Sequence, residues 1–183
     1  MKILALDLAI RSGFAFGVAG NAPRTIRSGV VVLKDSDDGR EISYANLIAW
    51  LDERFRADRP DLVVKEAPLN LQGYRNLGNA AATVRITFGL HAVVEGVCAR
   101  FRIRCEEAAD ATIRKHFIGR ANCGSRAATK AAVVQRCHAL GYMPREATSD
   151  DRADAIAIWD FAAATFGRRQ PHDLVLFGEG RAA

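Results

Sequence analysis

The alternation of apolar and polar positions in the first 34 residues predicts three consecutive strands. Residues 3–6 form a short apolar run of the kind found in the central strand of a covered sheet, and Asp7 follows it. We place a tight turn at residues 12–13, because apolar side chains return at every second position over residues 14–18. The β-branched run at residues 28–34 predicts the third strand.

The remainder of the chain alternates between helical and strand patterns. Apolar spacings of three and four residues predict helices, and short apolar runs between turn signals predict strands. The predicted order is a helix at 41–58, a strand at 62–64 that continues into Glu66, a helix at 80–99, a strand at 101–105, and helices at 110–117, from Ser125 or Thr129 to 140, and at 150–166 after a Ser149 cap. This order favours an α/β fold with a mixed five-stranded sheet flanked by helices.

Composition and charge limit the possible functions without choosing one. The 183 residues are 49% hydrophobic and 26% charged, so we assign residues 1–167 to one globular domain and residues 168–183 to a polar C-terminal tail. The net charge of +5 favours a polyanionic partner but does not prove one. The cysteines form no CxxC pair, which indicates reduced thiols. With no signal peptide and no apolar run of membrane-spanning length, we expect a cytoplasmic protein without a membrane partner.

Two predicted central strands carry an acid at or near their ends. Asp7 interrupts the first apolar run, and Glu66 ends the strand that begins at residue 62. A carboxylate inside a sheet is costly unless it is paired or binds a metal. Ligands of open parallel sheets bind beyond the carboxyl ends of the strands, so the two acids are placed to meet there. Taken alone, Glu66 is better explained as an ordinary surface acid.

The last predicted helix adds two acids on one face. Asp151 and Asp154 are three residues apart, so their side chains share a side of the helix and repel each other unless a cation lies between them. Asp150 lies on the same side, and favourable charge in a first helical turn accounts for Asp150 and Asp151 equally well. It does not account for Asp154, which lies among alanines and isoleucines.

A metal site explains the four acids together. Oxygen ligands without cysteine or histidine suit hard divalent ions such as Mg²⁺ or Mn²⁺. Two such ions about 4 Å apart clamp the attacking and leaving oxygens in phosphodiester hydrolysis. The pooled carboxylates of Asp7, Glu66, Asp151 and Asp154 are what such a pair of ions needs.

Three stretches resemble the RuvC-type Holliday junction resolvases of the RNase H-like (retroviral integrase) superfamily. They are DLAIRSG at the first strand, VVKEAP at the end of the fourth, and DRADAIA in the last helix. The resemblance covers residues 2–166 and suits a divergent, phage-like member. It implies an RNase H-like fold and an endonuclease that resolves four-way (Holliday) DNA junctions by paired cuts. Carried over to this sequence, the resemblance implies that Asp7, Glu66, Asp151 and Asp154 are the metal-binding catalytic acids. Paired cuts also imply a homodimer, for which the helix at 80–99 is the candidate interface. The apolar residues of this helix suit a core helix as well as a dimer interface, and the sequence does not separate the two.

The resemblance further implies phosphate contacts from the helices that precede the last motif. The best matches are Arg114 or Lys115, and Lys130, with a solvated helix surface as the alternative. One departure is that no phenylalanine closely follows the second acid. Tyr74, in the polar loop after it, is the candidate aromatic for stacking on a base at the junction centre, and Arg75 is an exposed candidate beside it.

Other functions stay open at this point. A different RNase H-like nuclease, acting on RNA, hybrids or other branched DNA, would keep the same four acids. A non-catalytic nucleic-acid-binding relative would not need those acids to converge. An actin-like ATPase shares a similar first hairpin, but that family usually needs two such domains and Gly/Thr-rich phosphate loops, and the turn after Asp7 reads Ile10-Arg11-Ser12.

Overall fold

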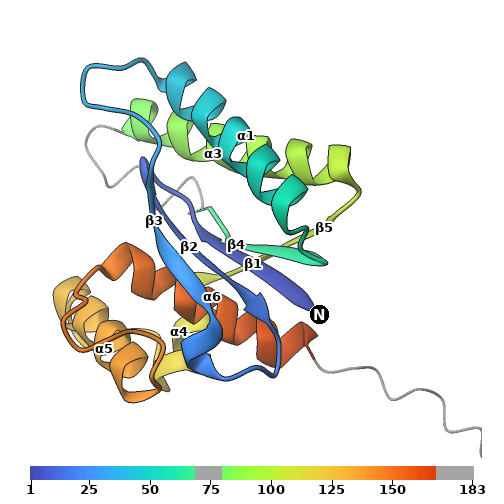
Figure 1. The fold of residues 1–183 in the computed structure, drawn as a ribbon. Coiled ribbons are helices and arrows are strands. Elements are labelled where there is room, and N and C mark those ends of the chain that lie inside the picture. Colours follow the sequence, from blue (N-terminus) through green and yellow to red (C-terminus); the bar gives the residue numbers. More distant parts are fainter. Residues whose placement is uncertain (69–79, 168–183) are drawn as a thin grey trace, which may run out of the picture.

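The computed structural model describes residues 1–68 and 80–167 of the chain. The sequence-based candidates Tyr74 and Arg75 lie outside the described residues, as does the predicted tail at 168–183. The described part consists of one sheet with helices on both of its faces (Figure 1).

A mixed sheet of five strands forms the centre of the fold, as the sequence predicts. The strands are β1 (Lys2–Asp7), β2 (Arg11–Val18), β3 (Arg27–Val32), β4 (Leu62–Glu66) and β5 (Arg104–Ala108). Their order across the sheet is β3-β2-β1-β4-β5 (Figure 1). The first three strands pair antiparallel, whereas β4 pairs parallel with both β1 and β5. The carboxyl ends of β1 and β4 therefore lie side by side.

Within the described residues, five helices cover the sheet. One face carries α1 (Arg40–Ala57) and α3 (Ala80–Phe101), and the other carries α4 (Asp110–Ile118), α5 (Arg126–Ala139) and α6 (Asp150–Phe166) (Figure 1). A short 3-10 turn, η1 (Pro23–Thr25), precedes β3. Side chains alternate along β1, so Ile3 and Ala5 pack with α6 while Leu4 and Leu6 pack with α1 and α3. The same alternation turns Asp7 towards α6.

The turn between the first two strands differs from the sequence-based prediction. It lies at residues 8–10, whereas Ser12 and Gly13 already belong to β2. Ser12 is buried, and its hydroxyl donates to the carbonyl oxygen of Ala9 (2.6 Å) and accepts from the Ala9 amide (3.2 Å). The serine thus closes the turn from inside the strand instead of forming it.

The strand predicted at residues 101–105 is also misplaced, because β5 starts only at Arg104. Phe101 is instead the last residue of α3, where its ring packs edge-on against Phe55 at a centroid distance of 5.4 Å. The chain then reverses through Arg102, which has a left-handed backbone conformation (φ 53°). The apolar alternation in this stretch therefore arises from a helix end and a turn.

Serine caps begin two of the helices that cover the sheet. The Ser125 side chain accepts a hydrogen bond from the amide of Ala128, so α5 starts after Ser125 and not at Thr129. The Ser149 side chain accepts one from the amide of Arg152, as predicted. The second cap fixes the start of the helix that carries Asp151 and Asp154.

Helix α3 contradicts the expectation that no apolar stretch of the chain is long enough to span a membrane. By length and composition alone, Ala82–Phe101 is apolar enough to cross a membrane. In the fold, however, Leu90 and Val94 of this helix are fully buried in the core that it shares with α1 and the sheet. Its apolar character is therefore used at least in part for packing within the domain.

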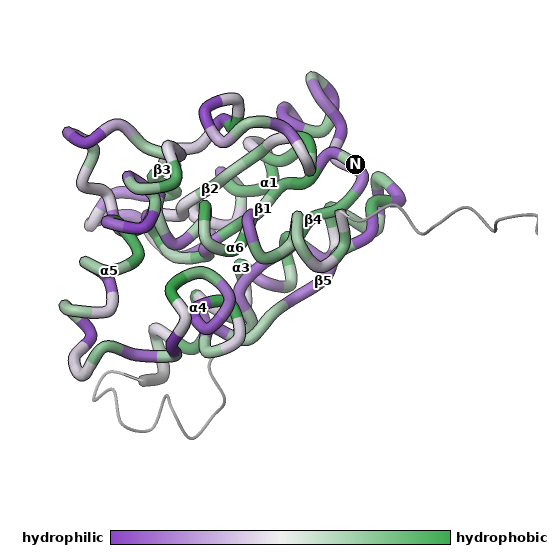
Figure 2. Tube along the Cα trace, turned by 90° about the horizontal axis from the view of Figure 1, so that it is seen from below, coloured by the Kyte–Doolittle hydropathy of each residue, from purple (hydrophilic) through white to green (hydrophobic). Residues whose placement is uncertain are grey.

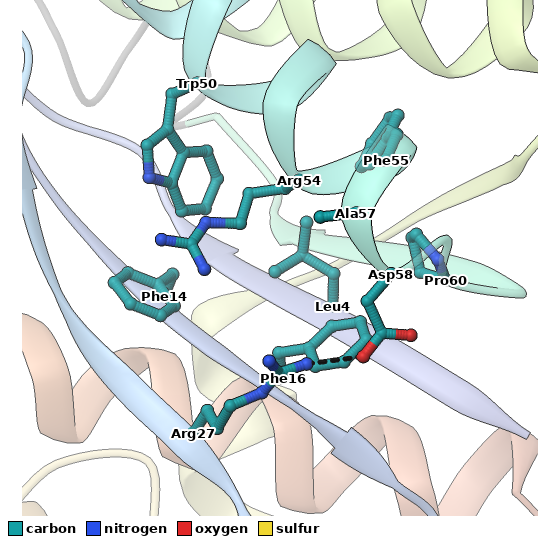
Figure 3. Close-up of a pocket in the computed structure, with 10 residues that line it drawn as sticks. All are labelled: Leu4, Phe14, Phe16, Arg27, Trp50, Arg54, Phe55, Ala57, Asp58 and Pro60. Atoms are coloured by element: carbon teal, nitrogen blue, oxygen red, sulfur yellow. Dashed lines mark hydrogen bonds and ion pairs between the residues drawn. The ribbon is translucent and has the colours of Figure 1, made fainter.

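An aromatic cluster joins β2 to α1 on the sheet face that points away from Asp7 (Figure 3). The rings of Phe14 and Trp50 lie 5.2 Å apart, and the Arg54 guanidinium lies 5.8 Å and 5.4 Å from their centres. The cavity beside them has a volume of about 40 Å³, which is room for a few water molecules. The cluster therefore packs α1 onto the sheet and is too small to hold a substrate.

Candidate active site

Helix α6 approaches β2 closely at Gly13, and this contact brings its acids to Asp7. Gly13 is the direct partner of Asp7 across the β1–β2 ladder. A Cβ atom at Gly13 would lie only 1.9 Å from the carbonyl oxygen of Asp151, so a side chain there would collide with the backbone of α6. Glycine thus lets the first turn of α6 lie directly against the strand, which places Asp151 and Asp154 beside Asp7.

Gly13→Ala is expected to lower the free energy of unfolding by about 2 kcal/mol, because the α6 backbone has to move away from β2. Urea denaturation at neutral pH measures the change. The matched control is Gly96→Ala in α3, where an added Cβ meets no atom within 4 Å. That substitution is expected to stabilise the helix by roughly 0.5–1 kcal/mol. Equal effects of the two substitutions would contradict the close approach of α6.

The four predicted acids converge at the edge of the sheet where β1 and β4 end. Burial raises the pKa of Asp7 well above its usual value, and three neighbouring carboxylates raise it further, those of Asp154, Glu66 and Asp151. Burial, together with the charges of Asp110 and Asp154, raises the pKa of Glu66 to about 7. Burial likewise raises the pKa of Asp154 to about 6. The site therefore concentrates negative charge that the neighbouring cations of the described residues neutralise only in part.

Three of these carboxylates have no polar partner in the described part of the chain. Asp7, Glu66 and Asp154 make no side-chain hydrogen bond or ion pair there. Asp151 differs, because its Oδ2 lies 3.5 Å from the Nε atom of Arg11. Sequence reasoning did not single out Arg11, although a basic residue four positions after Asp7 was visible in the turn.

Asp150 differs from the other acids because it forms an ion pair with Lys130. The Nζ atom of Lys130 lies 2.5 Å from Asp150 Oδ2, and this contact lowers the pKa of Asp150. The other carboxylate oxygen accepts from the backbone amide of Asp151. Asp150 is thus the partner of a basic residue at the edge of the site, which is a role that the sequence left undecided.

Of the predicted phosphate-binding residues, two lie near the four acids and one does not. The positive charges of Arg114 and Lys130 lower the pKa values of Glu66 and Asp154, so both cations lie at the edge of the acid cluster. Lys115 is exposed and is not among the charges that chiefly set these pKa values. Of the pair Arg114 or Lys115, the structure therefore brings Arg114 to the site.

Asp110 is a further acid near the site, and the sequence analysis did not identify it as a site residue. It begins α4, pairs with Arg114 at 2.5 Å, and raises the pKa of Glu66. Its own pKa is raised by burial, while Arg114 lowers it. No sequence signal distinguished it from an ordinary acid in a first helical turn.

The donor atoms of the cluster suit a hard divalent ion. They are partly buried carboxylate oxygens, the pKa values of Asp7, Glu66 and Asp154 are raised, and these three acids lack an ion-pair partner among the described residues. In the part of the chain that the structure describes, however, no three acidic, histidine or cysteine side chains stand together as a finished ligand set. The residues therefore fit the ion by the chemistry of their donor atoms, without forming a complete ligand set in this conformation.

Comparison of sequences identifies no relative, since no family model and no curated protein matches the chain. Comparison of structures does find similar folds. Thermus thermophilus RuvC has 14% sequence identity over 90% of this chain and 96% of its own, with a TM-score of 0.63. The same protein in complex with a Holliday junction substrate has a TM-score of 0.65 at the same identity and coverage.

One yeast structure and one viral structure are also similar to this chain. The yeast mitochondrial Holliday junction resolvase Ydc2 has 14% identity over 85% of this chain and 75% of its own, with a TM-score of 0.54. The fowlpox virus resolvase, in a complex with Holliday junction DNA, has 12% identity over 92% of this chain and all of its own, with a TM-score of 0.51. The chain therefore has the RNase H-like fold of the RuvC-like Holliday junction resolvases.

Proposed function

We propose that this protein is a divalent-metal-dependent endonuclease that resolves four-way DNA junctions by paired phosphodiester hydrolysis. The observation that carries the proposal is the convergence of Asp7, Glu66, Asp151 and Asp154 at one sheet edge, in the fold of proteins described as Holliday junction resolvases. Two of the similar structures hold Holliday junction DNA, which supports branched DNA as the substrate class.

The four acids would hold Mg²⁺ or Mn²⁺, with two ions per subunit as the proposed number. When bound, such ions activate water and stabilise the leaving oxygen of a phosphodiester. The chain supplies the negative charge that concentrates the ions and the buried position that keeps them at the sheet edge. Asp7 is the central member, because the other three acids all raise its pKa.

The cations at the edge of the cluster are proposed to hold the DNA backbone. Arg114 and Lys130 each pair with an acid outside the set of four, namely Asp110 and Asp150. A phosphate that approaches the cluster can exchange with these carboxylates as the partner of the cations. Arg11, which is exposed and beside Asp151, is placed to make a third contact of this kind.

We further propose a homodimer that forms through α3 and the adjoining surface of α1. The two helices pack side by side, and the hydroxyl of Tyr44 donates to the carbonyl oxygen of Arg85 (2.9 Å). Their outer surface exposes large apolar side chains, among them Phe88 at 40% and Ile48 at 39% exposure. Paired cuts require two active sites on one junction, so a dimer supplies the symmetry that the reaction needs.

Phe88→Asp is expected to weaken this dimer at least tenfold, roughly the effect of losing one central interface residue. Sedimentation velocity over a range of protein concentrations measures the change. Val32→Asp on β3 is the matched control, because Val32 is also an exposed apolar side chain, at 53% exposure, but lies on an edge strand of the sheet and not on α1 or α3. Weaker dimerisation of both variants, or unchanged dimerisation of both, would count against an interface on α3.

A panel of labelled substrates tests the proposed function. The panel consists of a four-way junction, a flap, an RNA–DNA hybrid and a duplex, each incubated in Mg²⁺ with the wild type and Asp7→Asn. Symmetric nicks in the junction alone, absent from the variant, are the expected result. Preferential cutting of flaps or hybrids would mean that the same four acids serve a different RNase H-like nuclease activity. Binding without metal-dependent cutting of any substrate would favour a non-catalytic relative.

A further inference from the structure

A groove between α4 and α5 is separate from the acid cluster. It has a volume of about 730 Å³, and the two helices lie next to each other in both views of the fold (Figure 1, Figure 2). Apolar side chains including Phe117 and Ala132 form part of its lining. The polar part of the lining comes from His116, Arg120 and Arg136, together with Gln135.

The two arginines of the groove are free to meet an anion. Neither Arg120 nor Arg136 has an ion-pair partner within residues 1–68 and 80–167, and both are exposed. The third basic residue is already engaged, since His116 Nε2 lies 2.8 Å from Asp160 Oδ2. The groove therefore presents two unpaired guanidinium groups beside an apolar surface.

The surrounding sequence is strongly and uniformly basic. Residues 111–145 contain seven of the 26 lysines and arginines of the chain and none of its 21 acids. The remainder of the chain thus has more acids than bases, although the whole chain carries +5. The positive charge of this protein is concentrated in α4, α5 and the segments that flank them, and a basic segment of this kind is typical of nucleic-acid-binding surfaces.

Helix geometry separates the groove from the active site. Lys130 and Arg136 are six residues apart on α5, which is about 240° around the helix at 100° per residue, so they point to different flanks. On α4, Arg114 lies at the acids, whereas Arg120 follows the C-terminal end of the helix. One helical layer therefore carries a basic edge at the acids and a second basic edge in the groove.

We propose that the α4–α5 groove binds the sugar–phosphate backbone of a DNA arm other than the strand that is cut. This inference rests on the proposed function for its choice of DNA. The two guanidinium groups contact backbone phosphates, and the apolar part of the lining lies against the sugars. Two guanidinium groups in one groove favour a polymer with several phosphates over a single small anion. Because the contacts are to the backbone, they add affinity without sequence preference.

Junction binding by the double variant Arg120→Gln/Arg136→Gln tests the proposal. Fluorescence anisotropy in EDTA measures binding without cleavage, over a range of salt concentrations. The expected loss of affinity at moderate salt is about tenfold, and the slope of log K against log salt is expected to fall by about two, because two phosphate contacts are removed. The matched control is Arg24→Gln/Arg40→Gln, which removes two exposed arginines outside the groove.

The outcomes separate this proposal from the proposed function. A tenfold loss that the control pair does not share supports the groove, whether or not the wild type cuts junctions. Equal affinity and equal salt slope in the two double variants would overturn the groove while leaving the nuclease proposal in place. Displacement of the junction from the wild type by millimolar inorganic phosphate at constant ionic strength would also overturn it, because the site would then bind single anions. In each variant, circular dichroism confirms that the fold is retained.

Discussion

Asp7→Asn is expected to raise the melting temperature of the metal-free protein by roughly 5 °C, while it reduces junction cleavage to background. The asparagine keeps the shape of the side chain but removes a buried charge that three other carboxylates repel. The same charge is the centre of the proposed ion site, so the change that stabilises the fold removes the proposed activity. Thermal unfolding in EDTA and junction cleavage in Mg²⁺ are the two measurements.

An exposed acid provides the control for this substitution. Asp37→Asn removes one negative charge from the polar turn after β3, and it is expected to change neither the melting temperature nor cleavage. A lower melting temperature for Asp7→Asn than for the wild type in EDTA would mean that Asp7 makes a stabilising interaction in the absence of metal. That result would contradict the argument that the four carboxylates destabilise the metal-free protein by mutual repulsion.

The second expected result is a loss of stability of the metal-free protein as the pH rises from about 4 to about 8. The folded-state pKa values of Glu66 and Asp154, about 7 and about 6, lie above the ordinary values for these residues. An acid with a raised pKa contributes stability that is complete below its unfolded pKa and is lost as the pH passes its folded pKa. For Glu66 alone the loss is on the order of 3 kcal/mol.

Urea midpoints at pH 5 and pH 8 in EDTA measure this dependence. Glu66→Gln is the comparison, because its side chain cannot ionise, and its midpoint is expected to fall less over the same range. Mg²⁺ is expected to reduce the difference between the two pH values for the wild type only, because the ion compensates the ionised carboxylates. An equal fall of the urea midpoint in both proteins would show that ionisation of Glu66 does not destabilise the fold.

The positions of Asp7 and Asp154 in the site were predictable because a charged residue inside an apolar stretch stands out in a sequence. Asp7 follows an apolar run, and Asp154 lies among small apolar residues, so neither fits a solvated surface. The parallel pairing of β1 and β4 then brings Glu66 to the same edge, as expected for strands that end together. Apolar patterns also identified the sheet, because strand alternation and helix periodicity differ clearly over several residues.

Other parts of the site depend on contacts that local patterns do not encode. Arg11 reaches Asp151 only because Gly13 admits α6 to the face of β2. The choice between Arg114 and Lys115 depends on the rotation of α4 about its axis, which adjacent residues of like charge do not reveal. The misplaced strand at residues 101–105 has the same cause, since Phe101 is apolar in order to pack against Phe55 from the end of a helix.

The proposed function requires that the four converging acids bind divalent ions. Mn²⁺ binding in the absence of DNA, measured by the loss of the free-ion electron paramagnetic resonance signal, tests this requirement. Saturable binding by the wild type and by Asp37→Asn, and its loss in Asp7→Asn and Asp154→Asn, is the predicted result. Equal Mn²⁺ binding by all four proteins, or its absence from the wild type, would mean that this requirement is not met.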